Sequence, residues 1–62
     1  MKTIIIDNYK IVIKMINECY KFIISLNNMI IDELLFNESE FGSFEEVEEY
    51  AIDYVSDLSF EY

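Results

Sequence analysis

The 62-residue chain contains no proline, tryptophan, arginine or histidine, and it has one cysteine and one glycine. A lone cysteine cannot close a disulfide within the chain, and without histidine the usual zinc ligand sets are missing. The lack of histidine also excludes Ser-His and Cys-His nucleophiles, and the single glycine excludes a glycine-rich phosphate loop. We therefore expect no cofactor, no metal and no enzymatic activity.

One partial metal motif is present. Asn37, Ser39, Gly42 and Glu48 fall at positions 1, 3, 6 and 12 of an EF-hand-like loop. The first position lacks the usual aspartate, and the fifth is Phe41, which offers no oxygen ligand. This mismatch disfavours calcium binding.

Long apolar runs are also missing. The longest has three residues, whereas a membrane-spanning helix needs about 20 mostly apolar positions. The N-terminus lacks the longer apolar core and the cleavage site of a signal peptide. Since 53% of the residues are nevertheless hydrophobic, we expect one small folded domain over residues 1–62. A cytoplasmic location fits the lone Cys19.

Charge is divided unequally along the chain. All four lysines lie in the first 21 residues, which have a net charge of +2, whereas residues 22–62 carry eleven carboxylates and no basic side chain. The whole chain has a net charge of −9. Such a surface repels nucleic acid and anionic membranes and attracts basic protein surfaces. We therefore expect a basic protein as partner, with no direct nucleic-acid binding and no membrane binding.

A helical period runs through the first half of the sequence. Polar residues recur at steps of three and four, which predicts a long helix over about residues 8–36. They are Asp7, Lys10, Lys14, Asn17, Lys21, Ser25, Asn28 and Asp32. The opposite side has the alternating spacing of a coiled-coil seam and is the predicted dimer interface. Its members are Tyr9, Val12, Ile16, Cys19, Ile23, Leu26 and Ile30.

A second interpretation of the N-terminal region stays open. Residues 3–6 and 9–13 are rich in β-branched and aromatic side chains, and Asp7-Asn8 between them suits a two-residue turn. This alternative is an α+β fold with a β-hairpin over residues 3–13 followed by helices.

A second helix is predicted over about residues 44–58. Gly42 precedes it, and Ser43 with Glu46 three positions later forms the pattern of a capping box. At 1.5 Å per residue, this helix is about half as long as the first and cannot cover its broad apolar circumference. The main prediction is therefore an all-α helical hairpin that assembles as a dimeric helical bundle.

The second helix also carries the predicted partner-binding surface. Its acidic residues Glu45, Glu49, Asp53 and Asp57 repeat every four positions. Like charges at this spacing weaken a helix, so stability alone does not favour such an acidic row. The candidate binding residues are Glu45, Glu46, Glu48, Glu49, Ile52, Asp53 and Asp57. Carboxylates in such a row suit lysine and arginine sites that otherwise hold phosphates.

These features favour a small acidic inhibitor that binds the nucleic-acid-binding surface of another protein. In size, charge and composition the chain resembles anti-CRISPR and other DNA-mimic proteins of phages, and its eleven isoleucines and five asparagines suit an AT-rich genome. The alternatives are an antitoxin or immunity protein that blocks a basic toxin, and a purely structural helical oligomer whose acidity serves solubility.

Overall fold

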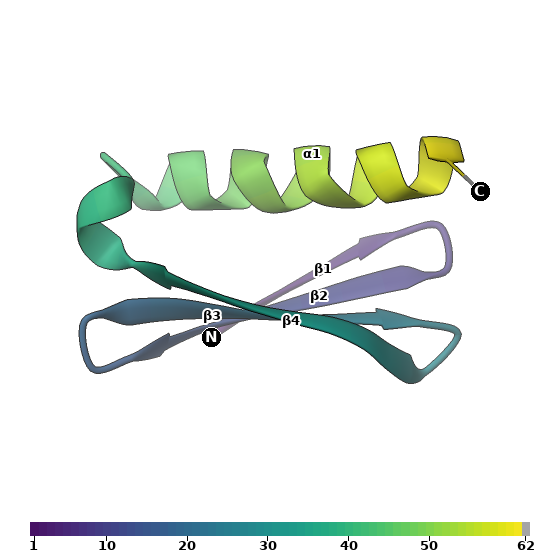
Figure 1. Cartoon of the computed structure of the whole chain (residues 1–62), viewed down its shortest axis with the longest axis horizontal. Coiled ribbons are helices and arrows are strands. Elements are labelled where there is room, and N and C mark those ends of the chain that lie inside the picture. The colour runs from purple at the N-terminus through teal and green to yellow at the C-terminus, as the bar shows by residue number, and fades with distance from the viewer. Residues whose placement is uncertain (62) are drawn as a thin grey trace.

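A computed structural model describes the backbone of residues 1–61 and the side chains of residues 1–58. Four strands come first, followed by one turn of 3-10 helix and a single C-terminal α-helix (Figure 1). The elements are β1 (Lys2–Ile6), β2 (Tyr9–Ile16), β3 (Cys19–Leu26), β4 (Met29–Asn37), η1 (Glu38–Glu40) and α1 (Phe44–Glu61). The fold is α+β, so the prediction of an all-α helical bundle is wrong.

The four strands form an antiparallel meander in the order β1-β2-β3-β4. Each connection is a two-residue turn, at Asp7-Asn8, Asn17-Glu18 and Asn27-Asn28. The alternative prediction of a hairpin over residues 3–13 is correct in this respect, because β1 and β2 pair across Asp7-Asn8. Two more strands follow that hairpin, where helices had been predicted.

The turns depend on residues that tolerate a left-handed backbone. Asp7, Asn17, Asn27 and Asn28 all have positive φ, between 51° and 68°. Asn and Asp adopt this backbone conformation more readily than other non-glycine residues, because their short side chains form local hydrogen bonds. The Asn27-Asn28 turn has positive φ at both central positions, as a type I′ hairpin turn requires. Asparagine and aspartate thus replace the glycine that such turns usually contain.

The turns also explain why a helix was predicted over residues 8–36. They recur every ten residues, and the apparent helical period mixes turn residues such as Asp7, Asn17 and Asn28 with strand residues such as Lys10 and Lys14. A half-buried strand normally alternates polar and apolar residues. That alternation is hidden here, because Val12 and Ile16 occupy outward positions between the lysines.

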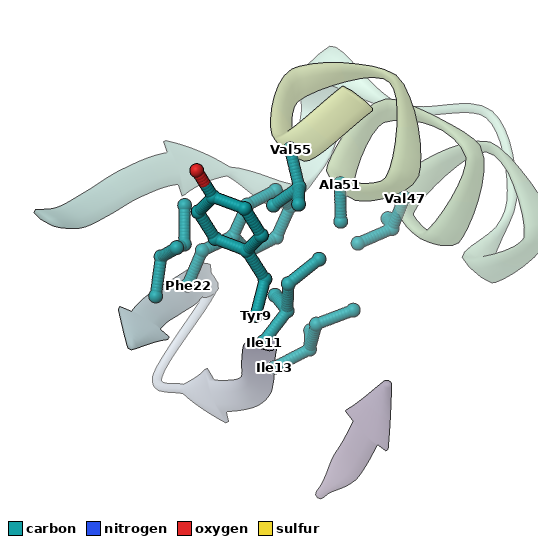
Figure 2. Close-up of a cluster of buried hydrophobic side chains, with 8 residues drawn as sticks. Tyr9, Ile11, Ile13, Phe22, Val47, Ala51 and Val55 are labelled. Carbon is teal, nitrogen blue, oxygen red and sulfur yellow. The ribbon is translucent and has the colours of Figure 1, made fainter. Parts of the chain in front are cut away.

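Helix α1 lies across one face of the sheet and encloses the core (Figures 1 and 2). Val47, Ala51 and Val55 occupy successive turns of α1, and all three are fully buried. They pack against alternate residues of the two central strands. These strand residues are Tyr9, Ile11, Ile13, Phe22 and Ile24. Helix side chains spaced four residues apart and strand side chains spaced two residues apart therefore pack together in one apolar layer.

The start of α1 confirms the predicted helix boundary. The Glu46 amide donates to Ser43 Oγ over 3.4 Å, and the Glu46 carboxylate accepts from the Gly42 amide at 2.5 Å. The helix continues to Glu61, three residues beyond the predicted end. No helix in the described part of the chain is long and apolar enough to cross a membrane.

A bulge and a side-chain contact mark the edge strand β4. The register between β3 and β4 shifts at Ile24/Ser25, so that Ile24 pairs with Asp32 and Ser25 with Ile30. Asp32 accepts a hydrogen bond from the Tyr54 hydroxyl of α1 and another from the Glu33 amide at 2.9 Å. The hydrogen bond to Asp32 raises the pKa of the Tyr54 phenol, and partial burial adds to this effect. The Tyr54–Asp32 hydrogen bond joins α1 to the outer strand of the sheet.

Candidate protein-binding surface

The outer side of α1 displays a row of carboxylates. Because Val47, Ala51 and Val55 point into the core, residues on the opposite side of the helix face solvent. Glu45, Glu49, Asp53 and Asp57 repeat every four residues there, and all four are exposed. At 1.5 Å per residue, successive carboxylates of this acidic row lie about 6 Å apart along the axis.

No lysine neutralises the acidic row within the described side chains, residues 1–58. The ion pairs found there lie elsewhere: Lys2 Nζ is 3.5 Å from Glu48 Oε1, and Lys21 Nζ is 3.2 Å from Glu33 Oε1. Like charges at this spacing weaken a helix by about 0.2–0.5 kcal/mol per pair. The row therefore combines a cost in stability with a free negative surface.

The remaining predicted binding residues have different positions. Ile52 is exposed on α1, on the border of the acidic row. Glu46 holds the Gly42 amide, and half-buried Glu48 pairs with Lys2 of β1. The structure thus brings Glu45, Glu49, Ile52, Asp53 and Asp57 together on one solvent-facing surface and gives Glu46 and Glu48 structural contacts.

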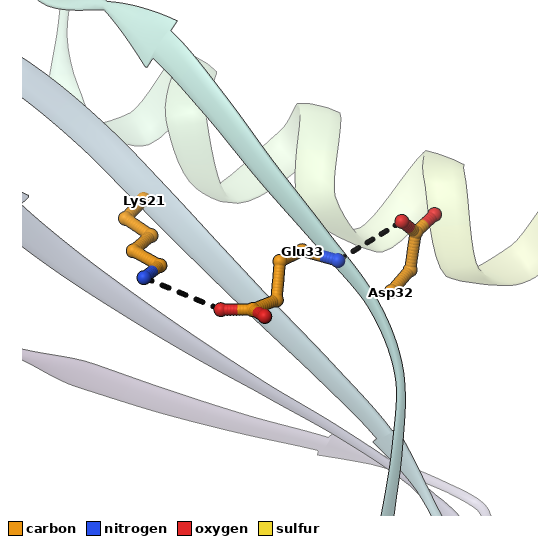
Figure 3. Close-up of polar contacts among 3 residues, drawn as sticks. All are labelled: Lys21, Asp32 and Glu33. Atoms are coloured by element: carbon orange, nitrogen blue, oxygen red, sulfur yellow. Dashed lines mark hydrogen bonds and ion pairs between the residues drawn. The ribbon is translucent and has the colours of Figure 1, made fainter.

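Three of the four lysines lie on the side of the sheet away from α1. Lys10, Lys14 and Lys21 are on the central strands, at positions that alternate with the core residues. Lys14 and Lys21 stand directly opposite each other, and Lys21 reaches Glu33 on β4 (Figure 3). The covering helix is therefore acidic, whereas the uncovered side of the sheet carries most of the cations. Sequence reasoning missed this separation because it placed the lysines on a helix.

The predicted dimer seam is divided between the two faces of the sheet. Tyr9 and Leu26 pack in or against the core beneath α1. The other five, Val12, Ile16, Cys19, Ile23 and Ile30, occupy the alternate positions and point away from α1. The predicted arrangement of these residues along one side of a helix is therefore wrong, although five of them do share one face of the sheet.

A shallow hollow of about 470 Å³ lies at one corner of this uncovered face. Its lining combines apolar side chains with the Lys21–Glu33 ion pair. The lining residues are Ile16, Asn17, Cys19, Lys21, Glu33, Leu34 and Leu35. Cys19 is half-buried with a free thiol. Among the described residues, no group of three cysteine or carboxylate side chains is arranged to hold a metal ion.

The residues of the partial EF-hand motif have other contacts. The Asn37 side chain accepts from the Ser39 amide at 3.2 Å, and the Glu40 carboxylate accepts from the Asn37 amide at 2.9 Å. These bonds cap η1, whereas Glu48 lies in α1 and faces β1. The motif therefore forms a cap that leads from the sheet into the helix.

Comparison with known proteins identifies no relative: no protein-family model matches the chain, and no curated protein or solved structure matches it. Function is therefore inferred from the surface.

Proposed function

We propose that this protein is a small cytoplasmic, non-enzymatic inhibitor that binds a basic surface of another protein through the acidic row of α1. The observation that carries this proposal is the exposed run of Glu45, Glu49, Asp53 and Asp57, without a neutralising lysine among residues 1–58. Basic surfaces that bind phosphates attract such a row. The favoured target is a nuclease or other nucleic-acid-binding effector, as for a phage protein that acts in its bacterial host.

The position of the row on the fold supports this role. The opposite side of α1 is anchored by three fully buried residues and by the Tyr54–Asp32 hydrogen bond. The outer carboxylates are therefore held on a rigid helix and need little ordering on binding. Removing their charge leaves the core contacts unchanged.

A charge-matched pair of variants tests the proposal. Replacing Glu45, Glu49 and Asp53 by Gln, Gln and Asn removes three charges from the row. The control removes three exposed charges elsewhere through Asp7→Asn, Glu18→Gln and Glu38→Gln. Each purified protein is immobilised, exposed to bacterial lysate at low and high salt, and eluted with DNA. We expect wild type and control to retain the same nucleic-acid-binding proteins, and the α1 variant to lose them.

Competition provides the decisive measurement. The retained effector is mixed with labelled nucleic acid, and the inhibitor is titrated in. Occupation of one basic surface predicts that nucleic acid is displaced, with a weaker effect at high salt. Equal inhibition by the α1 variant, or a stable ternary complex with nucleic acid, would contradict the proposal.

The second candidate is an antitoxin or immunity protein that blocks a basic toxin through the same surface. The unneutralised row favours it equally, because any cationic site is complementary to that row. A retained partner that DNA does not elute, and whose toxicity the protein suppresses, would select this second function.

A further inference from the structure

The side of the sheet that α1 leaves uncovered is unusually apolar. We call it the open face. An antiparallel sheet with one solvated face normally shows polar residues there, yet half of these positions are apolar. The open face consists of Thr3, Ile5, Lys10, Val12, Lys14, Ile16, Cys19, Lys21, Ile23, Ser25, Ile30, Glu33, Leu35 and Asn37. Ile5, Ile30 and Leu35 are 71%, 64% and 65% exposed.

We propose that the open face packs against the open face of a second copy, giving a dimer with four layers in the order α1, sheet, sheet, α1. This inference concerns self-association and does not depend on the proposed inhibitory function. Its interface differs from the helical seam predicted from the sequence, since it uses both edge strands as well as the central pair.

The width of the exposed apolar surface favours a sheet as its occupant. Ile5 lies on β1 and Leu35 on β4, and these edge strands are three strand spacings apart, or about 14 Å. One helix, about 10–12 Å wide with its side chains, does not cover that width. The covered face shows this directly: Phe22 and Ile24 on the central strand β3 are fully buried beneath α1, whereas Ile4 and Leu34 on the edges are only partly buried.

The size of the open face suits a weak, concentration-dependent dimer. Four strands spaced about 4.8 Å apart and about eight residues long, at about 3.3 Å per residue, give roughly 500 Å² per copy. Two copies would bury roughly 1,000 Å², which is about the threshold for a biological interface and below the range of about 1,200–2,000 Å² for stable complexes. A ligand in the hollow of about 470 Å³ would cover only one corner of this area.

Face-to-face packing also keeps the negative charges apart. Each α1 would lie on the outside of the dimer, with two sheets about 10 Å apart between them. The acidic rows would then be separated by roughly 30 Å or more, well beyond the screening length of about 8 Å at physiological salt. The inner layer would contain Lys10, Lys14 and Lys21, of which Lys21 is paired with Glu33 (Figure 3).

The lysines give the proposal its most specific consequence. Lys14 lies directly opposite Lys21, and like charges at such positions repel each other. A second sheet would partly desolvate both, so removing one charge should strengthen the dimer. An acidic protein partner on the open face would instead need these lysines, and their removal would leave self-association unchanged.

Sedimentation velocity from about 1 to about 200 µM tests the proposal on the wild-type chain and on variants whose folding is checked by circular dichroism. Leu35→Asp on the open face is matched with Ile52→Asp on α1, because both add one negative charge. We expect a concentration-dependent dimer that Leu35→Asp weakens by about tenfold or more and Ile52→Asp by less than about twofold. Lys14→Gln should strengthen it severalfold.

The unmodified chain provides a second measurement. Cys19 is its only cysteine and lies on the open face, so its alkylation rate should fall as the dimer forms. Four results would each overturn the proposal. Two of them are a monomer at about 200 µM in high salt and a dimer that both aspartate variants weaken equally. The others are a dimer that Lys14→Gln leaves unchanged or weakens, and a dimer in which Cys19 is not protected from alkylation. None of these results depends on whether α1 binds a basic partner.

Discussion

The two faces of the sheet are built from the same strands and differ by one position along each of them. On β3, Ile24 is fully buried beneath α1, whereas its neighbour Ile23 points to the open face and is half-buried. The covered face is apolar at all its strand positions except Lys2 and Asp32, whereas half of the open-face positions are polar. Hydrophobic content therefore favours the covered face as the core, and shape and charge add to the difference.

Aromatic rings distinguish the covered face. Phe22 and Phe36 project from it and contact Tyr50 of α1, with ring centroids 6.1 and 5.0 Å away. The open face carries no aromatic residue and has three lysines. Aromatic side chains bury about 150–250 Å² each, and lysine ammonium groups are costly to desolvate. Covering the aromatic face therefore yields more stability from one helix.

The largest effect on stability is expected when two adjacent isoleucines on β3 are replaced in turn by alanine. Ile24→Ala should lower the free energy of unfolding by about 2–5 kcal/mol, because it leaves a cavity in the core. Ile23→Ala makes the same chemical change on the open face and should cost less than about 1.5 kcal/mol at protein concentrations too low for association. Urea unfolding measures both values, and equal losses would show that the two faces are packed alike.

The second largest loss of stability is expected when the contact between α1 and β4 is removed. Tyr54→Phe removes the hydrogen bond to Asp32 and should cost about 1–2 kcal/mol at pH 7. The pKa of Tyr54 is raised in the folded state, so the stabilisation is fully present below the unfolded-state pKa of about 10 and declines as the pH rises above it. Stability measured against pH should therefore show a smaller alkaline decline for Tyr54→Phe than for wild type.

The turns keep the two faces distinct, because a shift of one residue in register would exchange them. Asn28 has a φ of 68°, so Asn28→Ala should cost about 1 kcal/mol. Asn28→Gly should instead keep or slightly raise the stability, because glycine adopts this conformation freely. Thermal unfolding of both variants measures the difference; a loss for glycine as large as that for alanine would indicate that the Asn28 side chain itself stabilises the turn.

The smallest effects should come from the acidic row. Replacing Glu45, Glu49 and Asp53 by their amides relieves repulsion and should raise the stability by a few tenths of a kcal/mol per pair, less the favourable interaction of Glu45 with the N-terminus of α1. Added salt should reproduce this gain in wild type and have less effect on the variant. A clear loss of stability on neutralising these residues would mean that the carboxylates make stabilising contacts in the fold.

Local signals were sufficient for the end of the chain. Ser43 and Glu46 predicted the start of α1, and the four-residue spacing of its apolar and acidic residues predicted which side faces solvent. Both follow from contacts between residues within one or two helical turns. Glu45, Glu49, Ile52, Asp53 and Asp57 are accordingly exposed on one side of α1, and their binding of a partner stays a prediction.

The prediction of a helix in the first 36 residues failed for a physical reason. Their apolar residues fill both faces of the strands, so the two-residue alternation is weak, and turn residues between the lysines imitate a helical period. The recurrence of Asp7, Asn17 and Asn27 at intervals of ten was the available signal for three hairpins. It required recognising asparagine and aspartate as turn residues without glycine.

The sequence by itself determined the acidic character, the lack of histidine and the amphipathic C-terminal helix, because these depend on composition or on neighbouring residues. Only the tertiary structure decided between a helix and hairpins in the N-terminal half, and only it showed that α1 covers the aromatic face of the sheet and that Lys10, Lys14 and Lys21 gather on the other. Strand pairing and helix docking join residues far apart in the chain. Their free energies depend on which surfaces meet, which no local pattern specifies.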